Sequence, residues 1–228
     1  MKLRNLLFIV LAAIVFCNCQ SYQPTSLTVA SYNLRNANGS DSARGDGWGQ
    51  RYPVIAQIVQ YHDFDIFGTQ ECFLHQLKDM KEALPGYDYI GVGRDDGKDK
   101  GEHSAIFYRT DKFDIVEKGD FWLSETPDVP SKGWDAVLPR ICSWGTFNNF
   151  DPNSFTESRI DHIFVSPSFH VKRYGVLTDT YRSVRENSKK EDVRDCPEEI
   201  TIKAYEARTP SDHFPVKVEL VFDQRQQK

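Results

Sequence analysis

The sequence predicts one α/β or α+β domain in which packed β-sheets dominate and a few helices flank them. Two observations carry this prediction: the chain begins with a β-α-β pattern, and a long succession of strand-like runs follows. The 228 residues are 39% hydrophobic and 13% aromatic, an ordinary composition for one globular domain, so no second domain is required.

The β-α-β beginning rests on three short patterns. Alternation over Leu27–Asn33 predicts a strand, and a polar, glycine-rich loop is expected over residues 36–49. Apolar residues at helical spacing predict a helix over Pro53–Tyr61. A short buried strand over Asp65–Gly68 is then expected to end at Thr69-Gln70-Glu71.

Strands dominate the rest of the chain. A second helix is predicted over Phe73–Leu84, where one face is apolar and Pro85-Gly86 ends the pattern. Polar loops are expected over residues 145–158 and, as a mixed charge run, over residues 182–199. Strand-like runs occupy residues 87–92, 104–109, 115–123, 141–144, 160–165, 171–177 and 215–222.

The N-terminus has the pattern of an export signal. Lys2 and Arg4 precede an apolar run, Leu6–Phe16, that is too short to span a bilayer but has the length of a secretory core. Cys17 and Cys19 follow, so either a lipoprotein site with a lipidated N-terminal cysteine or simple signal cleavage is open. We therefore expect residues 1–19 to be a leader, residues 20–228 to form the domain, and the protein to be exported, in the cell envelope or secreted.

Charge and cysteine content exclude some functions. The formal net charge is −5 and no basic stripe with interleaved aromatic residues occurs, so tight binding to duplex nucleic acid is not expected. Cys72, Cys142 and Cys196 show no Cys-x-x-Cys spacing, so neither a disulfide framework nor a zinc site is indicated. We expect a monomer that acts on a small or locally charged substrate.

Polar residues lie at the ends of predicted strands in four separate segments: Asn33, Glu71, Asp161 and the pair Asp212-His213. Catalytic groups are often displayed at such strand ends. A histidine beside a carboxylate is suited to act as a general base. Glu71 follows a buried strand, where a hard divalent cation would satisfy its charge. These residues are therefore candidates for metal-assisted chemistry.

The amino-acid sequences of those segments are similar to the motifs of one superfamily. Ser31-Tyr32-Asn33-Leu34-Arg35, Thr69-Gln70-Glu71, Arg159-Ile160-Asp161-His162-Ile163-Phe164-Val165 and Ser211-Asp212-His213-Phe214-Pro215-Val216 resemble, in order, motifs of the endonuclease/exonuclease/phosphatase superfamily, the DNase I-like proteins. The resemblance runs from about Leu27 to the last strand. Four motifs in sequence are far more specific than any one of them.

The resemblance implies a four-layered sandwich, two packed, mainly antiparallel sheets flanked by helices, and hydrolysis of phosphoesters with Mg²⁺, or alternatively Mn²⁺. It implies that Glu71 is the principal metal ligand and that Asn33 lies beside the metal or the phosphate. His213 resembles the base that activates water, Asp161 the carboxylate that orients it, and Asp212 a second acid near the metal. Glu102 resembles an acid that supports a phosphate-binding histidine.

Two further motifs of that superfamily are absent from this sequence. An Asn-x-His segment, which carries the phosphate-binding histidine, and a Gly-Asp-x-Asn turn do not occur; Gly45-Asp46 and Gly119-Asp120 are followed by Gly-Trp and Phe-Trp. The chain is also shorter than the ~250 residues common for such sandwiches. We therefore expect an incomplete fold that is internally shortened near residues 145–146, with exposed strand edges and a depleted core.

Three functions compete on these grounds. The first is an exported, divalent-metal-dependent phosphoesterase or phosphodiesterase that hydrolyses its ester by metal-assisted attack of water. The second is a catalytically defective relative that at most binds metal or phosphate, because losing members of a cooperating set costs orders of magnitude. The third is a lectin-like exported binding domain, which the aromatic content allows but the motif order disfavours.

Overall fold

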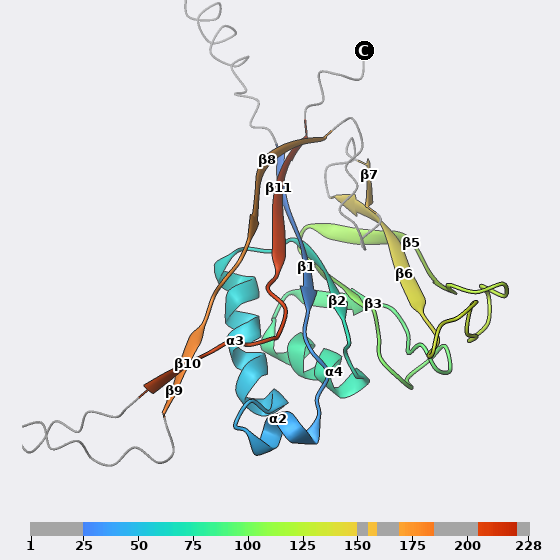
Figure 1. Cartoon of the computed structure of the whole chain (residues 1–228). Helices are drawn as coiled ribbons and strands as arrows, with labels where there is room; N and C mark the ends of the chain where they lie inside the picture. Colours follow the sequence, from blue (N-terminus) through green and yellow to red (C-terminus); the bar gives the residue numbers. More distant parts are fainter. Residues whose placement is uncertain (1–24, 150–154, 159–168, 185–204, 223–228) are drawn as a thin grey trace, which may run out of the picture.

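The larger of two packed sheets is the centre of the molecule. The computed structural model describes residues 25–149, 155–158, 169–184 and 205–222. The large sheet has the strand order β3-β4-β2-β1-β11-β8 (Figure 1). Its strands are β1 (Thr25–Asn33), β2 (Ile66–Gln70), β3 (Tyr87–Ile90), β4 (Ile106–Arg109), β8 (Phe169–Val176) and β11 (Val216–Phe222).

Pairing in this sheet brings distant parts of the chain together. β1 pairs in parallel with β2, and every other neighbouring pair is antiparallel. A parallel pair needs a crossover connection, which here contains helix α3 (Trp48–Tyr61). Because β1 and β2 are parallel, their carboxyl ends lie at the same edge, where Asn33 is paired with Gln70. The predicted β-α-β beginning is thus confirmed.

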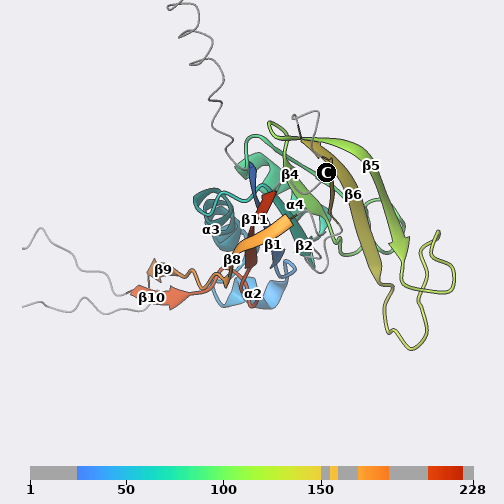
Figure 2. The same ribbon diagram turned by 90° about the horizontal axis from the view of Figure 1, so that it is seen from above.

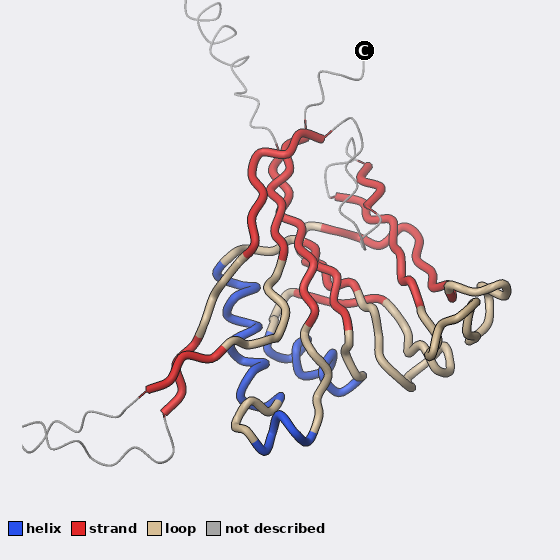
Figure 3. The backbone as a smooth tube through the Cα atoms, viewed as in Figure 1, coloured by secondary structure: helices blue, strands red, loops and turns tan. Residues whose placement is uncertain are grey.

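Helices cover one face of the large sheet. They are α3 and α4 (Leu74–Ala83), whereas the short α2 (Gly39–Ala43) lies beyond the carboxyl end of β1 (Figure 3). The first core cluster joins them to the sheet: Ala30 and Tyr32 of β1 and Phe67 of β2 pack with Ile55 of α3 and Leu77 of α4, and all five are fully buried. Burial of this kind contributes roughly 25 cal/mol per Å² of apolar surface.

The second sheet covers the opposite face. Its strands β5 (Phe113–Trp122), β6 (Ile141–Asn149) and β7 (Phe155–Ser158) are antiparallel. Seen from above, α3 and the strands β5 and β6 lie on opposite sides of β1 and β2 (Figure 2). Leu27 and Val29, on the other face of β1 from Ala30, pack in a second cluster with Phe113 and Phe147. The core therefore has two layers, one on each face of β1.

The predicted fold class is confirmed: two packed, mainly antiparallel sheets with flanking helices. Among the residues that the structure describes, helices cover only the face of the large sheet that points away from the second sheet, and none covers the second sheet. The strand predicted over residues 160–165 lies outside the described residues.

A two-stranded ribbon projects from this body. It consists of β9 (Tyr181–Val184) and β10 (Tyr205–Arg208), which are antiparallel, and it extends away from the sheets in both views (Figures 1 and 2). The charge run that predicted a loop over residues 182–199 thus begins in a strand. β10 leads directly to Ser211-Asp212-His213, so the ribbon is joined to the candidate site.

Three local predictions were wrong. Helix α2 lies inside the predicted loop 36–49, because the Asn38 side chain accepts a hydrogen bond from Asp41 N and caps a turn that has no apolar periodicity. Helix α3 begins at Trp48 rather than Pro53, and burial of Trp48 and Arg51 offsets the hydrogen bond that Pro53 cannot make. The predicted loop 145–158 is partly strand.

That third difference concerns the region of the expected shortening. β6 runs without interruption through residues 145 and 146, which pair with Lys118 and Glu117 of β5. Phe147 follows and is fully buried. Pairing with β5 and burial of Phe147 extend β6 through a segment whose sequence is otherwise polar.

One part of the inner sheet face is uncovered. On β8, Val171, Tyr174 and Val176 are 55%, 68% and 49% exposed. They are paired with Leu220, Val218 and Val216 of β11, so they point toward the side of the second sheet. Leu220 and Val218 are buried in the inner core. The apolar face thus continues onto the edge strand β8, where these side chains meet solvent.

Candidate active site

The ends of β1 and β2 bring two of the predicted site residues into direct contact. Asn33 is the last residue of β1, and Glu71 follows the last residue of β2. The Asn33 side-chain amide donates a hydrogen bond to Glu71 Oε1 at 2.9 Å. Glu71 has a φ of 62°, in the left-handed region that non-glycine residues seldom adopt. Such strain is often found at functional sites.

The amide of Asn33 is held at both of its polar atoms. Its Oδ1 accepts a hydrogen bond of 2.8 Å from the backbone N–H of Arg35, while its nitrogen donates to Glu71. Arg35 also has a positive φ, 56°. The chain thus turns sharply after β1, and this turn fixes the orientation of the Asn33 amide.

The Ser211-Asp212-His213 segment docks on the same strand end. Ser211 is buried and its hydroxyl donates to the backbone carbonyl of Asn33 at 2.7 Å. The backbone N–H of His213 donates to Ser211 Oγ at 3.3 Å. Arg35 Nη1 lies 3.3 Å from Asp212 Oδ2, so an ion pair joins the two segments. The His213 side chain is exposed.

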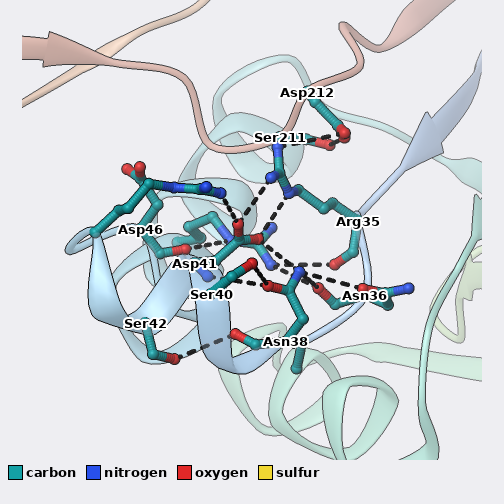
Figure 4. Close-up of polar contacts among 12 residues, drawn as sticks. Arg35, Asn36, Asn38, Ser40, Asp41, Ser42, Asp46, Ser211 and Asp212 are labelled. Carbon is teal, nitrogen blue, oxygen red and sulfur yellow. Dashed lines mark hydrogen bonds and ion pairs between the residues drawn. The ribbon is translucent and has the colours of Figure 1, made fainter.

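Arg35 lies between two carboxylates (Figure 4). On one side it meets Asp212; on the other its Nε and Nη2 donate to the two oxygens of Asp41, each at 2.7 Å. Asp41 is fully buried and also accepts from Arg44 and Asn38 at 2.6 and 2.9 Å. Burial raises the pKa of Asp41, but the hydrogen bonds from Arg35 and Asn38 outweigh it and hold this pKa below its usual value.

Glu102 reaches the site from the loop before β4. It accepts from Arg94 Nη1 at 2.5 Å and from the side-chain amide of Asn36 at 3.1 Å. Its neighbour His103 is buried, with Nδ1 3.2 Å from the carbonyl of Cys72. Glu102 is therefore held against the segment after β1 by Asn36.

Five of the six predicted site residues thus come together around the end of β1: Asn33, Glu71, Glu102, Asp212 and His213. The sixth, Asp161, lies outside the described residues. In the described ranges no group of three or more His, Cys, Asp or Glu side chains is arranged to hold a metal ion. Glu71 nevertheless offers carboxylate oxygens at this strand end, and the side-chain nitrogen of Asn33 faces one of them.

Sequence reasoning missed Arg51, which positions these segments. Arg51 is 1% exposed. Within the described part of the chain, every hydrogen-bond acceptor of its side chain is a backbone carbonyl. These acceptors belong to Asp46, Leu34, Pro210, Arg35 and Asn36, at 2.9, 2.8, 3.0, 3.1 and 3.4 Å. Because Pro210 directly precedes Ser211, Arg51 ties the last motif to the turn after β1. Arg51 belongs to no sequence motif. Every residue has a backbone carbonyl, so the sequence does not indicate which carbonyls accept from it.

Gln76 is a second such residue. It lies on α4 and is fully buried. Its oxygen accepts from the backbone N–H of Ala37 at 2.9 Å, and its nitrogen donates to the carbonyl of Arg35 at 3.1 Å. The turn after β1 is therefore held from α3 by Arg51 and from α4 by Gln76.

Comparison with sequences of known proteins gives partial matches. No protein-family profile matches the chain. Two uncharacterized proteins of Acanthamoeba polyphaga mimivirus are 30% and 33% identical to it over 121 and 93 residues, which are 46% and 38% of this chain. The matched stretches cover only 18% and 34% of those two proteins.

Comparison with solved structures gives two matches that cover the whole of the other chain and one that is partial. A mannosyl-6-phosphatase of Bacteroides thetaiotaomicron is 61% identical with a TM-score of 0.72; the match covers 86% of this chain and 100% of that one. An endonuclease/exonuclease/phosphatase protein of Bacteroides vulgatus is 41% identical, with a TM-score of 0.55, over 57% of this chain and 50% of that one. An endonuclease/exonuclease/phosphatase family protein of B. thetaiotaomicron is 63% identical, with a TM-score of 0.74, over 89% of this chain and 100% of that one. The strand-end motifs, the two packed sheets and this whole-length identity show that the chain belongs to the endonuclease/exonuclease/phosphatase family.

Proposed function

We propose that this chain is an exported, divalent-metal-dependent phosphoesterase that releases phosphate from a phosphorylated sugar by attack of water. The observation that carries the proposal is the contact between Asn33 and Glu71 at the end of two parallel strands, with Asp212 and His213 docked beside it. The phosphoester class follows from the family. The sugar phosphate is suggested by the B. thetaiotaomicron mannosyl-6-phosphatase, which is 61% identical.

The residues present fit a hard divalent cation. Mg²⁺ binds through one or two carboxylates together with waters and substrate phosphates, rather than in a cage of protein ligands. Glu71 would be the principal ligand, with Asn33 and Asp212 beside it, and Mn²⁺ would use the same oxygen donors. When bound, the cation would offset the negative charge that develops on the phosphoryl oxygens.

Each remaining residue has a role that its chemistry allows. His213 is exposed and would accept the proton of the attacking water. Asp161 would orient His213. The Asn33 amide keeps one N–H beyond the hydrogen bond to Glu71, and this N–H would donate to a phosphate oxygen without adding charge. Arg35 would hold Asp212 in place through their ion pair.

Export is supported by the sequence of the N-terminus. Lys2 and Arg4 precede the short apolar run, and Cys17 or Cys19 would carry a lipid if the leader is of the lipoprotein type. Among the described residues no helix has the length and apolar character needed to cross a membrane. We propose a monomer, either tethered at the cell envelope by this lipid or secreted. Mass spectrometry of the N-terminus of the exported protein would separate these two cases.

The test is hydrolysis of mannose 6-phosphate and of a generic aryl phosphodiester by the purified chain. Reactions with Mg²⁺, with Mn²⁺ and with EDTA are compared for the unmodified protein and for Glu71→Ala and His213→Ala. We expect metal-dependent release of phosphate that both substitutions abolish. Turnover of the diester instead would identify a phosphodiesterase.

A catalytically defective relative is the second candidate. The absence of the Asn-x-His and Gly-Asp-x-Asn motifs from the sequence favours it. In that case the unmodified chain would release no more phosphate than the two variants. Binding of Mg²⁺ or phosphate, measured by a shift of the melting temperature, would then be the remaining activity.

A further inference from the structure

A polar pocket lies beside the candidate site, between the turn after α2 and strand β10 of the ribbon. Its volume is ≈ 340 Å³, within the range of small-ligand sites. The walls are formed by Asp46, Arg51 and Arg35 on one side and by residues 206–209 and Ser211 on the other. Arg35 and Ser211 also contact Asp212 and Asn33. The pocket is therefore contiguous with the site proposed for the phosphate.

Arg208 fixes the geometry of this pocket. Its Nη1 donates to Asp46 Oδ1 at 2.6 Å and to the carbonyl of Arg44 at 3.0 Å. Its Nε donates to Ser183 Oγ at 2.6 Å, and it forms an ion pair with Glu206. Both strands of the ribbon are thus joined to the turn that follows α2. The two walls are held together without a ligand, so little ordering is required on binding.

The chemistry of the pocket favours hydroxyl groups over a second anion. Arg51 already hydrogen-bonds to five backbone carbonyls, and Arg35 faces Asp41 and Asp212. Most donors of these two guanidinium groups therefore already have acceptors within the protein. In contrast, Asp46 Oδ2 and the Thr209 hydroxyl have no hydrogen-bond partner among the residues that the structure describes. A carboxylate oxygen and a hydroxyl suit the hydroxyl groups of a neutral polyol.

We propose that this pocket is a specificity site for the polyhydroxylated, hexose-sized part of the substrate, bound by Asp46 and Thr209, on the basis of the phosphoesterase function proposed above. The phosphate would lie at Asn33 and Glu71, and the sugar ring would extend past Arg35 and Ser211 into the pocket. Asp46 and Thr209 bind the part of the substrate that does not react. They therefore set which sugar phosphate is accepted, rather than how fast its ester is broken.

The experiment uses the double variant Asp46→Asn with Thr209→Val, which keeps the size of both side chains and an oxygen for Arg208. Steady-state kinetics with mannose 6-phosphate are compared with those for p-nitrophenyl phosphate, which has no sugar. We expect KM for mannose 6-phosphate to rise about tenfold with little change in kcat, because the variant loses two hydrogen bonds to the sugar. The aryl phosphate should be hydrolysed as before. Thr178→Val, an exposed threonine that does not line the pocket, is the matched control.

Two kinetic outcomes would overturn the specificity site: unchanged KM for mannose 6-phosphate, or an equal loss on both substrates. Failure of the phosphoesterase function is distinguishable, because the unmodified chain would then hydrolyse neither substrate. Binding of unphosphorylated mannose is measured in every case by saturation-transfer NMR. Transfer to mannose in the unmodified chain that disappears in the double variant supports the pocket without reference to turnover. No transfer at millimolar mannose in the unmodified chain contradicts it.

Discussion

The Asn33 side chain donates a hydrogen bond to Glu71 across the ends of two parallel strands, at 2.9 Å. This contact joins two motifs that lie 38 residues apart in the sequence. Since Ser211 in turn donates to the Asn33 carbonyl, a third motif is held at the same place. Asn33 is therefore the residue around which the candidate site is assembled.

Replacing Glu71 by Gln should remove metal-dependent activity without unfolding the chain. Gln keeps an oxygen that can accept from Asn33, but it loses the negative charge of the proposed principal metal ligand. We expect kcat to fall on the order of a hundredfold or more. The increase in melting temperature on addition of Mg²⁺ should also be lost. Enzyme assays and thermal denaturation with and without Mg²⁺ measure both effects.

The matched control for that variant is Glu125→Gln, because Glu125 is exposed in the loop after β5. It should have the activity and the Mg²⁺ response of the unmodified protein. An active Glu71→Gln enzyme that keeps its melting-temperature shift would contradict the role proposed for Glu71.

The Asp41 carboxylate should make stability depend on acid pH. Its folded-state pKa is below the unfolded value of about 3.9. The stabilisation is therefore present above that unfolded value and is lost as the pH falls through the lower, folded-state pKa. Asp41→Asn should destabilise the fold by about 3 kcal/mol at pH 7, because Arg35 then loses its buried partner. It should also flatten the decline in stability below pH 4.

Urea unfolding midpoints at pH 7, 5 and 3.5 measure this effect. Asp111→Asn is the control: Asp111 also pairs with an arginine, but its side chain is 57% exposed, and exposed pairs contribute little. Equal pH profiles for Asp41→Asn and the unmodified protein would show that Asp41 does not carry the acid dependence.

The sequence was sufficient to predict the scaffold and the residues at its strand ends. Alternation over residues 27–33 and the apolar run before Glu71 predicted β1 and β2, and the polar residues that follow them do meet. Such predictions succeed because strand burial is periodic and because parallel strands end at one edge.

Most of the parts that were not predicted depend on tertiary contacts. Arg51 lies between the predicted loop and the predicted helix and was given no role, since its acceptors are backbone carbonyls from three separate segments. Helix α2 is capped by one polar side chain, Asn38, and has no apolar face that periodicity could detect. The extension of β6 to Asn149 depends on pairing with β5, because its own sequence is mostly polar. The contacts of Arg51 and the pairing of β6 are tertiary, whereas the cap of α2 is local but is not part of any apolar pattern.

Replacing Arg51 by Lys should destabilise the protein strongly. Burial lowers the pKa of Arg51, but a guanidinium remains charged in proteins. Lysine has three donors where five are used, so at least two buried carbonyls would lose their partner, at about 1–3 kcal/mol each. We expect a loss of about 3 kcal/mol in the free energy of unfolding, measured by urea denaturation.

Arg140→Lys is a suitable comparison, because Arg140 is exposed and its side chain has no hydrogen bond to another described residue. Its unfolding free energy should stay within about 0.5 kcal/mol of that of the unmodified protein. If Arg51→Lys were as stable as Arg140→Lys, the five carbonyl contacts would not carry the docking of the last motif.

The uncovered apolar face of β8 should bind hydrophobic probes. Tyr174 and Val176 point to the inner side of the large sheet yet are 68% and 49% exposed, on a strand at the edge of that sheet. Exposed apolar patches on edge strands favour association. The variant Tyr174→Thr with Val176→Thr keeps β-propensity and should lower both the fluorescence of bound anilinonaphthalene sulfonate and the light scattering of concentrated samples. Val116→Thr, a similarly exposed single valine on β5, should change neither signal. An equal decrease in the Val116 variant would show that the effect is not specific to the β8 face.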